Sequence, residues 1–300
     1  MQRITFLKLR IVSYLGDILQ KLVLYLIVGL IIGLIIGGVV GWVAKPVPEI
    51  PKPEEICAYS KGKFTEPPPP GKEVVIVHGF DAAYPPFTYV LPNGTAVGFD
   101  VDVIDWIAKK YGWKVIHKPW DWSTIVTALV NGDLDIIASG MTINAERMKK
   151  ICFSIPYYSY IHELVVWADE TRGVEEILNS GEYIAVQLGS TADEWAERLL
   201  KQGYNFKKLG LNSYVEALEA LLDGRAIAVI TDSAFLNPYL KKHPDLANKV
   251  KILTTLGAPE TYGIAFRCED KWLRDMVNDA LSELMHSPLW DQLLEKWGLK

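Results

Sequence analysis

The sequence predicts an α/β fold for residues 73–300, because short runs rich in β-forming residues alternate there with amphipathic helical stretches. Two segments of a different kind precede this region: first a long apolar run, then a proline-rich stretch. The chain of 300 residues is 50% hydrophobic and 22% charged, which is typical of globular proteins and excludes a disordered or fibrous one. We therefore expect a membrane-anchored chain whose α/β body carries the function.

The apolar run, residues 22–44, has the length and composition of a transmembrane helix. It contains no charged residue and fifteen Leu, Ile or Val residues. A helix of this length spans about 34 Å, against a hydrocarbon core of about 30 Å. Residues 1–21 hold four basic residues and one acid, so we expect a cytoplasmic N-terminus, a single pass through the cell membrane and an extracytoplasmic body. A cleaved signal peptide is the alternative, although its apolar region is usually only about 7–15 residues long.

Residues 45–72 form a predicted linker. They contain eight of the 17 prolines of the chain, and such a segment favours extended polyproline geometry over a packed core. Cys57 lies in this linker, and the three cysteines show no CxxC spacing, so neither a zinc site nor a disulfide scaffold is predicted. Cys57 is expected either to stay a free thiol or to pair with Cys268, and the sequence leaves both open.

The body alternates predicted strands and helices at a spacing typical of parallel sheets. Strands are expected at 73–79, 114–118, 134–139, 183–187 and 226–231, and helices at 100–110, 123–131, 191–201 and 213–224. We expect Asp100 to be the N-cap of the first helix, and Thr191 with Glu194 to form a capping box at the third. No nucleotide-binding fingerprint is present, and the net charge of −5 argues against a general nucleic-acid binder.

Charged and aromatic side chains follow several of these strands, where ligands gather in open α/β sheets. Arg147 comes soon after the third strand, and a guanidinium suits two-bond capture of a carboxylate. Thr191 begins a helix whose free N–H groups favour an anion. Asp232 ends a strand and can accept an ammonium group, while Tyr84 and Trp122 supply an aromatic wall. Together these residues predict a receptor for an α-amino acid.

Each of these residues also has a structural interpretation. Arg147 alone is more often a surface ion pair, here with Glu146, and Asp232 alone is as often a helix N-cap. Trp122 alone usually packs in a core or at its rim. The joint placement of these residues at strand ends favours the binding interpretation. Neither a cofactor motif nor a cluster of metal ligands is predicted.

The body resembles a known family in four stretches: DAAYPPFTYV, NGTAVGFDVDVIDWIAKKYGW, DWSTIVTALVNGDLDIIASGMTINAERMKKICFSIPYY and YGIAFR. These are similar to the extracytoplasmic solute-binding proteins (family 3) of amino-acid ABC transporters, which have the type 2 periplasmic-binding fold. The resemblance implies two lobes joined by two crossover hinge segments that close over an amino acid. Lobe 1 would comprise residues 73–158 and 259–300, and lobe 2 residues 159–258.

The resemblance also implies roles for individual residues. Arg147 would hold the α-carboxylate with the N–H groups of Thr142 and Thr191, and Asp232 would hold the α-ammonium with the Gly140 carbonyl and the Thr142 hydroxyl. The implied ligand-binding set is Asp81, Tyr84, Trp122, Ser139, Gly140, Thr142, Arg147, Gln187, Thr191 and Asp232, with Thr231 beside Asp81 and Gln187 at the far end. Gly140 stands where many members have a second serine, so only backbone is left there.

The expected function is capture of a polar or basic L-amino acid and its delivery to an ABC permease, because Asp81 is the one acid predicted at the far end of the pocket. One alternative is a ligand-sensing subunit for a signalling partner. Another is an enzyme similar to cyclohexadienyl dehydratase, which would need Asp81 or His162 as a general acid.

Overall fold

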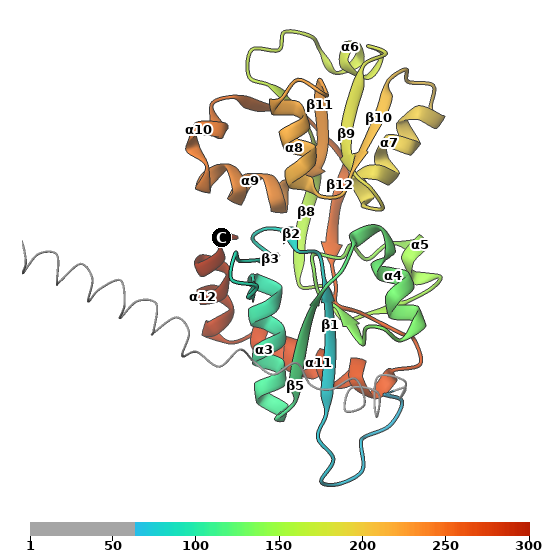
Figure 1. Cartoon of the computed structure of the whole chain (residues 1–300), viewed down its shortest axis with the longest axis vertical. Coiled ribbons are helices and arrows are strands. Elements are labelled where there is room, and N and C mark those ends of the chain that lie inside the picture. Colours follow the sequence, from blue (N-terminus) through green and yellow to red (C-terminus); the bar gives the residue numbers. More distant parts are fainter. Residues whose placement is uncertain (1–63) are drawn as a thin grey trace, which may run out of the picture. The chain divides into compact units, whose positions relative to one another are not determined.

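The computed structural model describes residues 64–300, and two five-stranded sheets divide this part of the chain into two lobes (Figure 1). The predicted cytoplasmic segment, the predicted anchor at 22–44 and most of the linker lie outside the described residues. None of the helices in residues 64–300 has the length and hydropathy needed to cross a bilayer.

The sheet of lobe 1 has the strand order β5-β1-β6-β13-β7, and helices flank both of its faces (Figure 1). Its strands are β1 (Val75–Phe80), β5 (Lys114–Pro119), β6 (Ile136–Ile137), β7 (Cys152–Phe153) and β13 (Ala265–Phe266). Its helices are α3 (Phe99–Tyr111), α4 (Trp122–Asn131), α5 (Ala145–Met148), α11 (Lys271–Met285) and α12 (Pro288–Trp297). A small antiparallel sheet of β2 (Ala83–Tyr84), β3 (Thr88–Val90) and β4 (Ala96–Val97) follows β1. The parallel pairing of β5, β1 and β6 confirms the predicted α/β class.

The sheet of lobe 2 has the order β10-β9-β11-β8-β12. Its strands are β8 (Tyr158–Trp167), β9 (Tyr183–Gln187), β10 (Lys207–Leu211), β11 (Ala228–Asp232) and β12 (Val250–Tyr262). Its helices are α6 (Val174–Leu178), α7 (Thr191–Lys201), α8 (Tyr214–Leu222), α9 (Ser233–Lys242) and α10 (Pro244–Ala247). The core strands β9 and β11 are parallel, whereas β8 and β12 run antiparallel to their neighbours.

Two long strands, β8 and β12, join the lobes and lie side by side between them (Figure 1). Their ladder shifts register between Leu256 and Glu260, and it ends with Tyr262 opposite Tyr158. Of the boundaries expected between the lobes, one falls at the start of β8 and the other inside β12. These two strands form the crossover connections between the lobes (Figure 1).

The structure corrects two predicted helix caps by one or two residues. The N-cap of α3 is Gly98, whereas the buried carboxylate of Asp100 accepts hydrogen bonds from the Gly140 N–H at 2.7 Å and the Tyr157 hydroxyl at 2.8 Å. The N-cap of α7 is Ser190, because its extended backbone lets its hydroxyl accept the Asp193 N–H. Thr191 is therefore the first helical residue and not the cap.

The disulfide bond of the described chain joins Cys152 to Cys268, which corrects the pairing of Cys268 with Cys57 left open above. Cys152 pairs with Phe266 in the sheet of lobe 1, so the chain just beyond β13 comes within bonding distance of β7. Cys57 itself lies outside the described residues. The bond closes a loop across a sequence separation of 116, which stabilises a protein by roughly 4–5 kcal/mol in the chain-entropy model.

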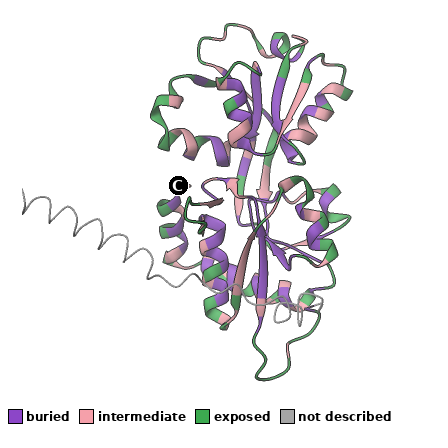
Figure 2. Ribbon diagram, in the orientation of Figure 1, coloured by how far each residue is buried: buried purple, intermediate pink, exposed green. Residues whose placement is uncertain are grey.

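Buried residues follow both sheets and the inner faces of their helices (Figure 2). Charged exceptions lie at the base of lobe 1, where Arg267 pairs with Asp135 at 3.0 Å and with Asp270 at 2.7 Å. Asp270 also accepts the backbone N–H of Phe64 at 2.6 Å. Because Phe64 is itself buried against Trp272, the first described residue is attached to lobe 1.

Candidate functional site

The polar residues at the strand ends of both lobes line a single pocket. It is lined by Asp81, Tyr84, Trp122, Ser139, Gly140, Thr142, Arg147, Gln187, Ser190, Thr191, Tyr214 and Asp232. This set contains all ten residues singled out from the sequence, and it adds Ser190 and Tyr214. Lobe 1 contributes the residues up to Arg147, and lobe 2 contributes the others.

Arg147 is buried at the lobe 1 side of the pocket, on the short helix α5. The N-cap Asn144 positions it, because the Asn144 side chain accepts the Arg147 N–H at 2.8 Å. Its guanidinium donates to the Thr142 carbonyl at 3.1 Å and across the lobes to the Gly189 carbonyl at 3.2 Å. Among the described residues it forms no salt bridge. The ion pair with Glu146 considered above is wrong, because Glu146 pairs with Lys149, and the guanidinium charge is left for an anionic group.

Asp232 ends β11 on the lobe 2 side and is fully buried. Its Oδ2 accepts the hydroxyls of Tyr84 and Tyr262, each at 3.0 Å, and its Oδ1 accepts the Tyr214 hydroxyl at 2.9 Å. His162 Nε2 lies 3.3 Å from Oδ1. Burial raises the pKa of Asp232, and His162 and the tyrosine hydroxyls oppose that shift. Asp232 occupies the N-cap position of α9 but makes no capping hydrogen bond, so its carboxylate is directed at this cluster.

The cluster around Asp232 has a shortage of hydrogen-bond donors. The hydroxyls of Tyr84 and Tyr262 also lie 2.5 Å from each other. Two hydroxyl protons cannot fill three contacts, namely two to the carboxylate and one between the tyrosines. A ligand group with several N–H donors and a positive charge matches this shortage, and an alkylammonium is such a group.

The far end of the pocket holds Asp81 from lobe 1 and Gln187 from lobe 2, which meet at 2.5 Å. Ser139 supports this end, since its hydroxyl accepts the Asp81 N–H at 3.0 Å. Burial raises the pKa of Asp81 to about 6, and the negative charges of Asp121 and Glu216 add to the shift. These two acids lie in an outer groove that shares Asp81 and Trp122 with the pocket.

Gly140 is required by a close contact with Tyr84. Its φ is +58°, and a Cβ there would lie 2.4 Å from Tyr84 Cε1. Such a distance is well inside van der Waals contact, and the left-handed backbone already disfavours any other residue. The ring of Tyr84 thus occupies the space that a serine side chain would need. This contact explains why a glycine follows Ser139 in this chain.

We expect Gly140→Ala to weaken ligand binding by about tenfold or more, because the displaced Tyr84 ring must also leave Asp232. Gly94→Ala is the matched control: Gly94 has φ +83° but no atom within 4 Å of its Cβ position. Isothermal titration calorimetry measures the affinity. Thermal unfolding measures the loss of stability that both variants share, because each places alanine in a left-handed backbone conformation. Equal losses of affinity in the two variants would contradict the role given to the Tyr84 contact.

Sequence reasoning missed several members of this site and misplaced one. Tyr214, which lines the pocket, and Tyr262, which donates to Asp232, were not predicted, although Tyr214 follows Ser213 at the start of the predicted helix and Tyr262 opens the YGIAFR stretch. Thr231 does not line the pocket, because neighbouring residues of a strand point to opposite faces and Asp232 points inward. No group of His, Cys, Asp and Glu in residues 64–300 is arranged to hold a metal ion.

Residues 76–300 match the model of the bacterial extracellular solute-binding proteins, family 3. The chain belongs to that family. As a family 3 protein it is a solute-binding protein and not an enzyme, which confirms that part of the prediction.

Individual relatives agree with this assignment. The family 3 protein is 32% identical over 228 residues to the "arginine-binding extracellular protein ArtP" of Bacillus subtilis, covering 76% of this chain and 87% of the relative. It is 30% identical over 220 residues to a "probable histidine-binding protein" of Neisseria gonorrhoeae, covering 73% and 81%. Among solved structures it resembles an ancestral arginine-binding protein bound to arginine, with 37% identity, a TM-score of 0.68, and coverage of 74% of this chain and 97% of the other.

A second similar solved structure is an amino-acid-binding protein described as the precursor of an enzyme. The ancestral amino-acid-binding protein AncCDT-1, described as a precursor of cyclohexadienyl dehydratase, is 34% identical, with a TM-score of 0.66 and coverage of 74% of this chain and 95% of the other. These matches show that the family 3 protein shares the two-lobed α/β fold, as the sequence predicts.

Proposed function

We propose that the chain binds an L-amino acid with a basic or polar side chain between its two lobes and delivers it to an ABC permease. One observation carries the proposal. Two oppositely charged, buried groups face one pocket from opposite lobes: the guanidinium of Arg147 and the carboxylate of Asp232. A zwitterion presents a matching carboxylate and ammonium, so both of its charges would be paired. The relatives named for arginine and histidine support this chemistry.

In the proposed pose, the α-carboxylate lies between Arg147 and the N-terminus of α7, where the first N–H groups and the helix dipole favour an anion. The α-ammonium donates to Asp232, to the Gly140 carbonyl and to the Thr142 hydroxyl oxygen. The side chain passes between Tyr84 and Trp122 toward Asp81 and Gln187. Charge-assisted hydrogen bonds of about 1.5–3 kcal/mol each are enough to reach micromolar affinity, about −8 kcal/mol.

Closure of the lobes couples this binding to transport. Hydrogen bonds already cross the pocket from lobe to lobe, between Gln187 and Asp81 and between Tyr84 and Asp232. A ligand held by both lobes binds the closed form more tightly than the open form, so it shifts the population toward closure. The closed form is the one we propose to dock on the permease.

A basic side chain is favoured by the charges at the far end of the pocket. Asp81 lines the pocket there, and Asp121 and Glu216 line the adjoining groove. Arg147, at the opposite end, is the one basic residue among the pocket-lining side chains. A cationic side chain would therefore meet acids and no basic residue beyond the aromatic residues.

We expect arginine binding to weaken as the pH falls through about 6, the raised pKa of Asp81. Protonation removes the charge that attracts the guanidinium, so the affinity falls by up to about tenfold per pH unit below that pKa. Glutamine, whose side chain is neutral, should show no such step. Calorimetry from pH 8 to pH 5 on the parent and on Asp81→Asn tests this, and a step that persists in Asp81→Asn would assign it to another group.

We also propose that residues 22–44 anchor the protein in the lipid bilayer, with residues 1–21 in the cytoplasm and residues 45–72 as a tether. The charge-free apolar run and the preceding basic residues support this. Fractionation of cells that express the full chain tests it: an anchored protein remains with the membranes after a carbonate wash. Recovery of a shortened protein in the medium would instead indicate a cleaved signal peptide.

A thermal-shift screen against the twenty amino acids tests the proposed function directly. A ligand at about 100 times its Kd stabilises the folded state by about 2.7 kcal/mol, so a cognate amino acid raises the melting temperature by several degrees. Loss of labelled amino-acid uptake in cells lacking the protein separates transport from signalling. Formation of product from prephenate or arogenate, or no shift with any amino acid, would contradict the proposal.

A further inference from the structure

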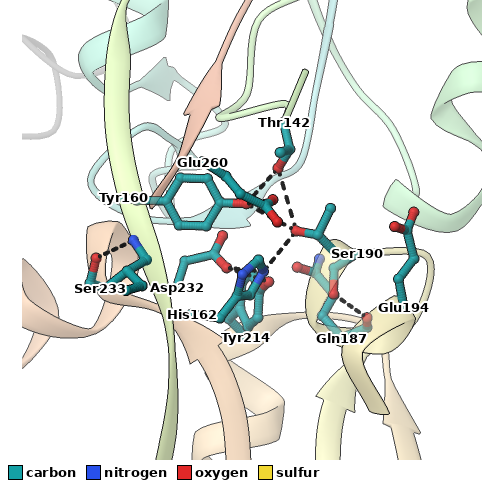
Figure 3. A network of polar contacts seen from close by, with 12 residues as sticks. Thr142, Tyr160, His162, Gln187, Ser190, Glu194, Tyr214, Asp232, Ser233 and Glu260 are labelled. Carbon is teal, nitrogen blue, oxygen red and sulfur yellow. Dashed lines mark hydrogen bonds and ion pairs between the residues drawn. The ribbon is translucent and has the colours of Figure 1, made fainter. Parts of the chain in front are cut away.

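A hydroxyl network connects the hinge strands to the proposed ligand site (Figure 3). Tyr160 lies on β8 directly opposite Glu260 on β12, and its hydroxyl donates to Glu260 Oε2 at 3.0 Å. The same hydroxyl oxygen lies 2.7 Å from Thr142 Oγ1 in lobe 1 and 3.1 Å from Thr191 Oγ1 in lobe 2. Neither Tyr160 nor Glu260 lines the pocket, whereas both threonines do.

The chemistry of these groups sets the direction of each hydrogen bond. A carboxylate can only accept, so the one proton of Tyr160 is directed to Glu260. The contacts of Tyr160 with the two threonines must then use the threonine protons, with the Tyr160 oxygen as acceptor. Burial raises the pKa of Tyr160 above its ordinary value, so the phenol keeps its proton at neutral pH.

On the lobe 2 side, a histidine fixes the direction of the hydrogen bonds that Thr191 makes. His162 Nε2 lies 2.9 Å from Thr191 Oγ1 and 3.3 Å from Asp232 Oδ1. Because the carboxylate can only accept, we place the ring hydrogen on Nε2, where Thr191 and Asp232 share it and Thr191 acts as an acceptor. Within the described residues Nδ1 of the same ring has no hydrogen-bond partner. Thr191 thus accepts from His162 and donates to Tyr160, and Thr142 likewise donates to Tyr160.

We propose that Glu260 is a positioning residue for ammonium recognition, acting through Tyr160 to hold the Thr142 hydroxyl with its lone pairs toward the pocket. With its proton directed to Tyr160, Thr142 can accept from the α-ammonium. If Glu260 is replaced by a group that cannot accept, the Tyr160 proton turns to a threonine oxygen and the Thr142 proton is displaced toward the pocket. That proton would face the ammonium as a second donor. This inference rests on the proposed function.

The test separates this relay from the negative charge of Glu260, which by itself attracts a cation. Glu260→Gln removes the charge but keeps an oxygen that can accept the Tyr160 proton. Glu260→Met removes the acceptor at similar length, and Tyr160→Phe removes the relay itself. Glu219→Gln, an exposed acid on α8 outside the site, is the matched control for loss of one charge. The probes are L-arginine and 5-guanidinopentanoic acid, which is arginine without its α-amino group.

We expect Glu260→Met and Tyr160→Phe each to weaken L-arginine binding by about tenfold, the value of one hydrogen bond to a charged group. Glu260→Gln should stay within about twofold of the parent. The double variant with Glu260→Met and Tyr160→Phe should bind L-arginine as weakly as either of these single variants, because each substitution removes the same relay. Binding of 5-guanidinopentanoic acid should change little in any of them. Melting temperatures measured without ligand show whether each variant is folded.

Several results would contradict the relay from Glu260 through Tyr160 to Thr142. Equal losses in Glu260→Gln and Glu260→Met would show that charge alone acts and would overturn the relay. Unchanged arginine affinity in Tyr160→Phe, or an equal loss of affinity for 5-guanidinopentanoic acid, would also overturn it. If Glu260→Met does not fold, the comparison of Tyr160→Phe with Glu260→Gln still decides. A parent protein that binds neither arginine nor any other amino acid would instead refute the proposed function.

Discussion

Arg147→Ala is expected to weaken amino-acid binding by at least about 3 kcal/mol, more than a hundredfold in Kd. In the proposed pose the guanidinium is the charged partner of the α-carboxylate, and its removal leaves that carboxylate buried without a counter-charge. The two hydrogen bonds of Arg147 to the Thr142 and Gly189 carbonyls are lost as well. One of them crosses between the lobes, so closure is also disfavoured. Calorimetry with the cognate amino acid measures the effect.

Two further variants interpret that result. Arg147→Lys keeps the charge but loses the planar fork, so its affinity should lie between those of the parent and Arg147→Ala. Arg198→Ala removes an exposed arginine that packs on Trp195 outside the pocket, and it should bind as the parent does. Unchanged affinity in Arg147→Ala, with Arg198→Ala as the reference, would refute the carboxylate assignment.

Asp232→Asn is expected to weaken binding by a similar amount, at least about 3 kcal/mol, because the α-ammonium loses its counter-charge. The same substitution should not destabilise the ligand-free folded protein. Burial raises the pKa of Asp232, so the ionised carboxylate is less favourable in the folded than in the unfolded protein at neutral pH. The amide keeps the shape and an acceptor for the tyrosine hydroxyls. We therefore expect an unchanged or higher melting temperature without ligand, together with a large loss of affinity.

Ligand affinity and ligand-free melting temperature together distinguish the possible roles of Asp232. Loss of binding with a lower melting temperature would indicate that Asp232 organises the tyrosine cluster rather than the ligand. Retention of binding would place the ammonium elsewhere. Because the screen identifies the cognate amino acid before the variants are made, neither result depends on which side chain the ligand has.

The strand ends of the site could be predicted from the sequence because local patterns determine them. β9 ends at Gln187 and α7 begins at Thr191 as expected, and the run of alternating strands and helices places Arg147 and Asp232 at ends where ligands gather. Backbone propensity, helix capping and the side-chain alternation of a strand act within a few residues. A single sequence displays all three.

Contacts between distant segments could not be predicted in the same way. Tyr84 meets Asp232 across a separation of 148 residues, and Gln187 meets Asp81 across 106. Cys152 pairs with Cys268 because β7 and β13 are neighbours in one sheet. Tyr160 and Glu260 are opposite one another only because the β8–β12 ladder shifts its register between Leu256 and Glu260. No local pattern encodes a register between strands so far apart.

The sequence by itself determined the α/β class, the family and the identity of the charged residues that line the pocket. The tertiary structure alone decided which of these residues face one another, which hydroxyls donate, and why Gly140 must be a glycine. The physical reason is one of range. Periodicity and capping depend on neighbours in the chain, whereas hydrogen-bond direction and close packing depend on groups that only the folded hinge brings together.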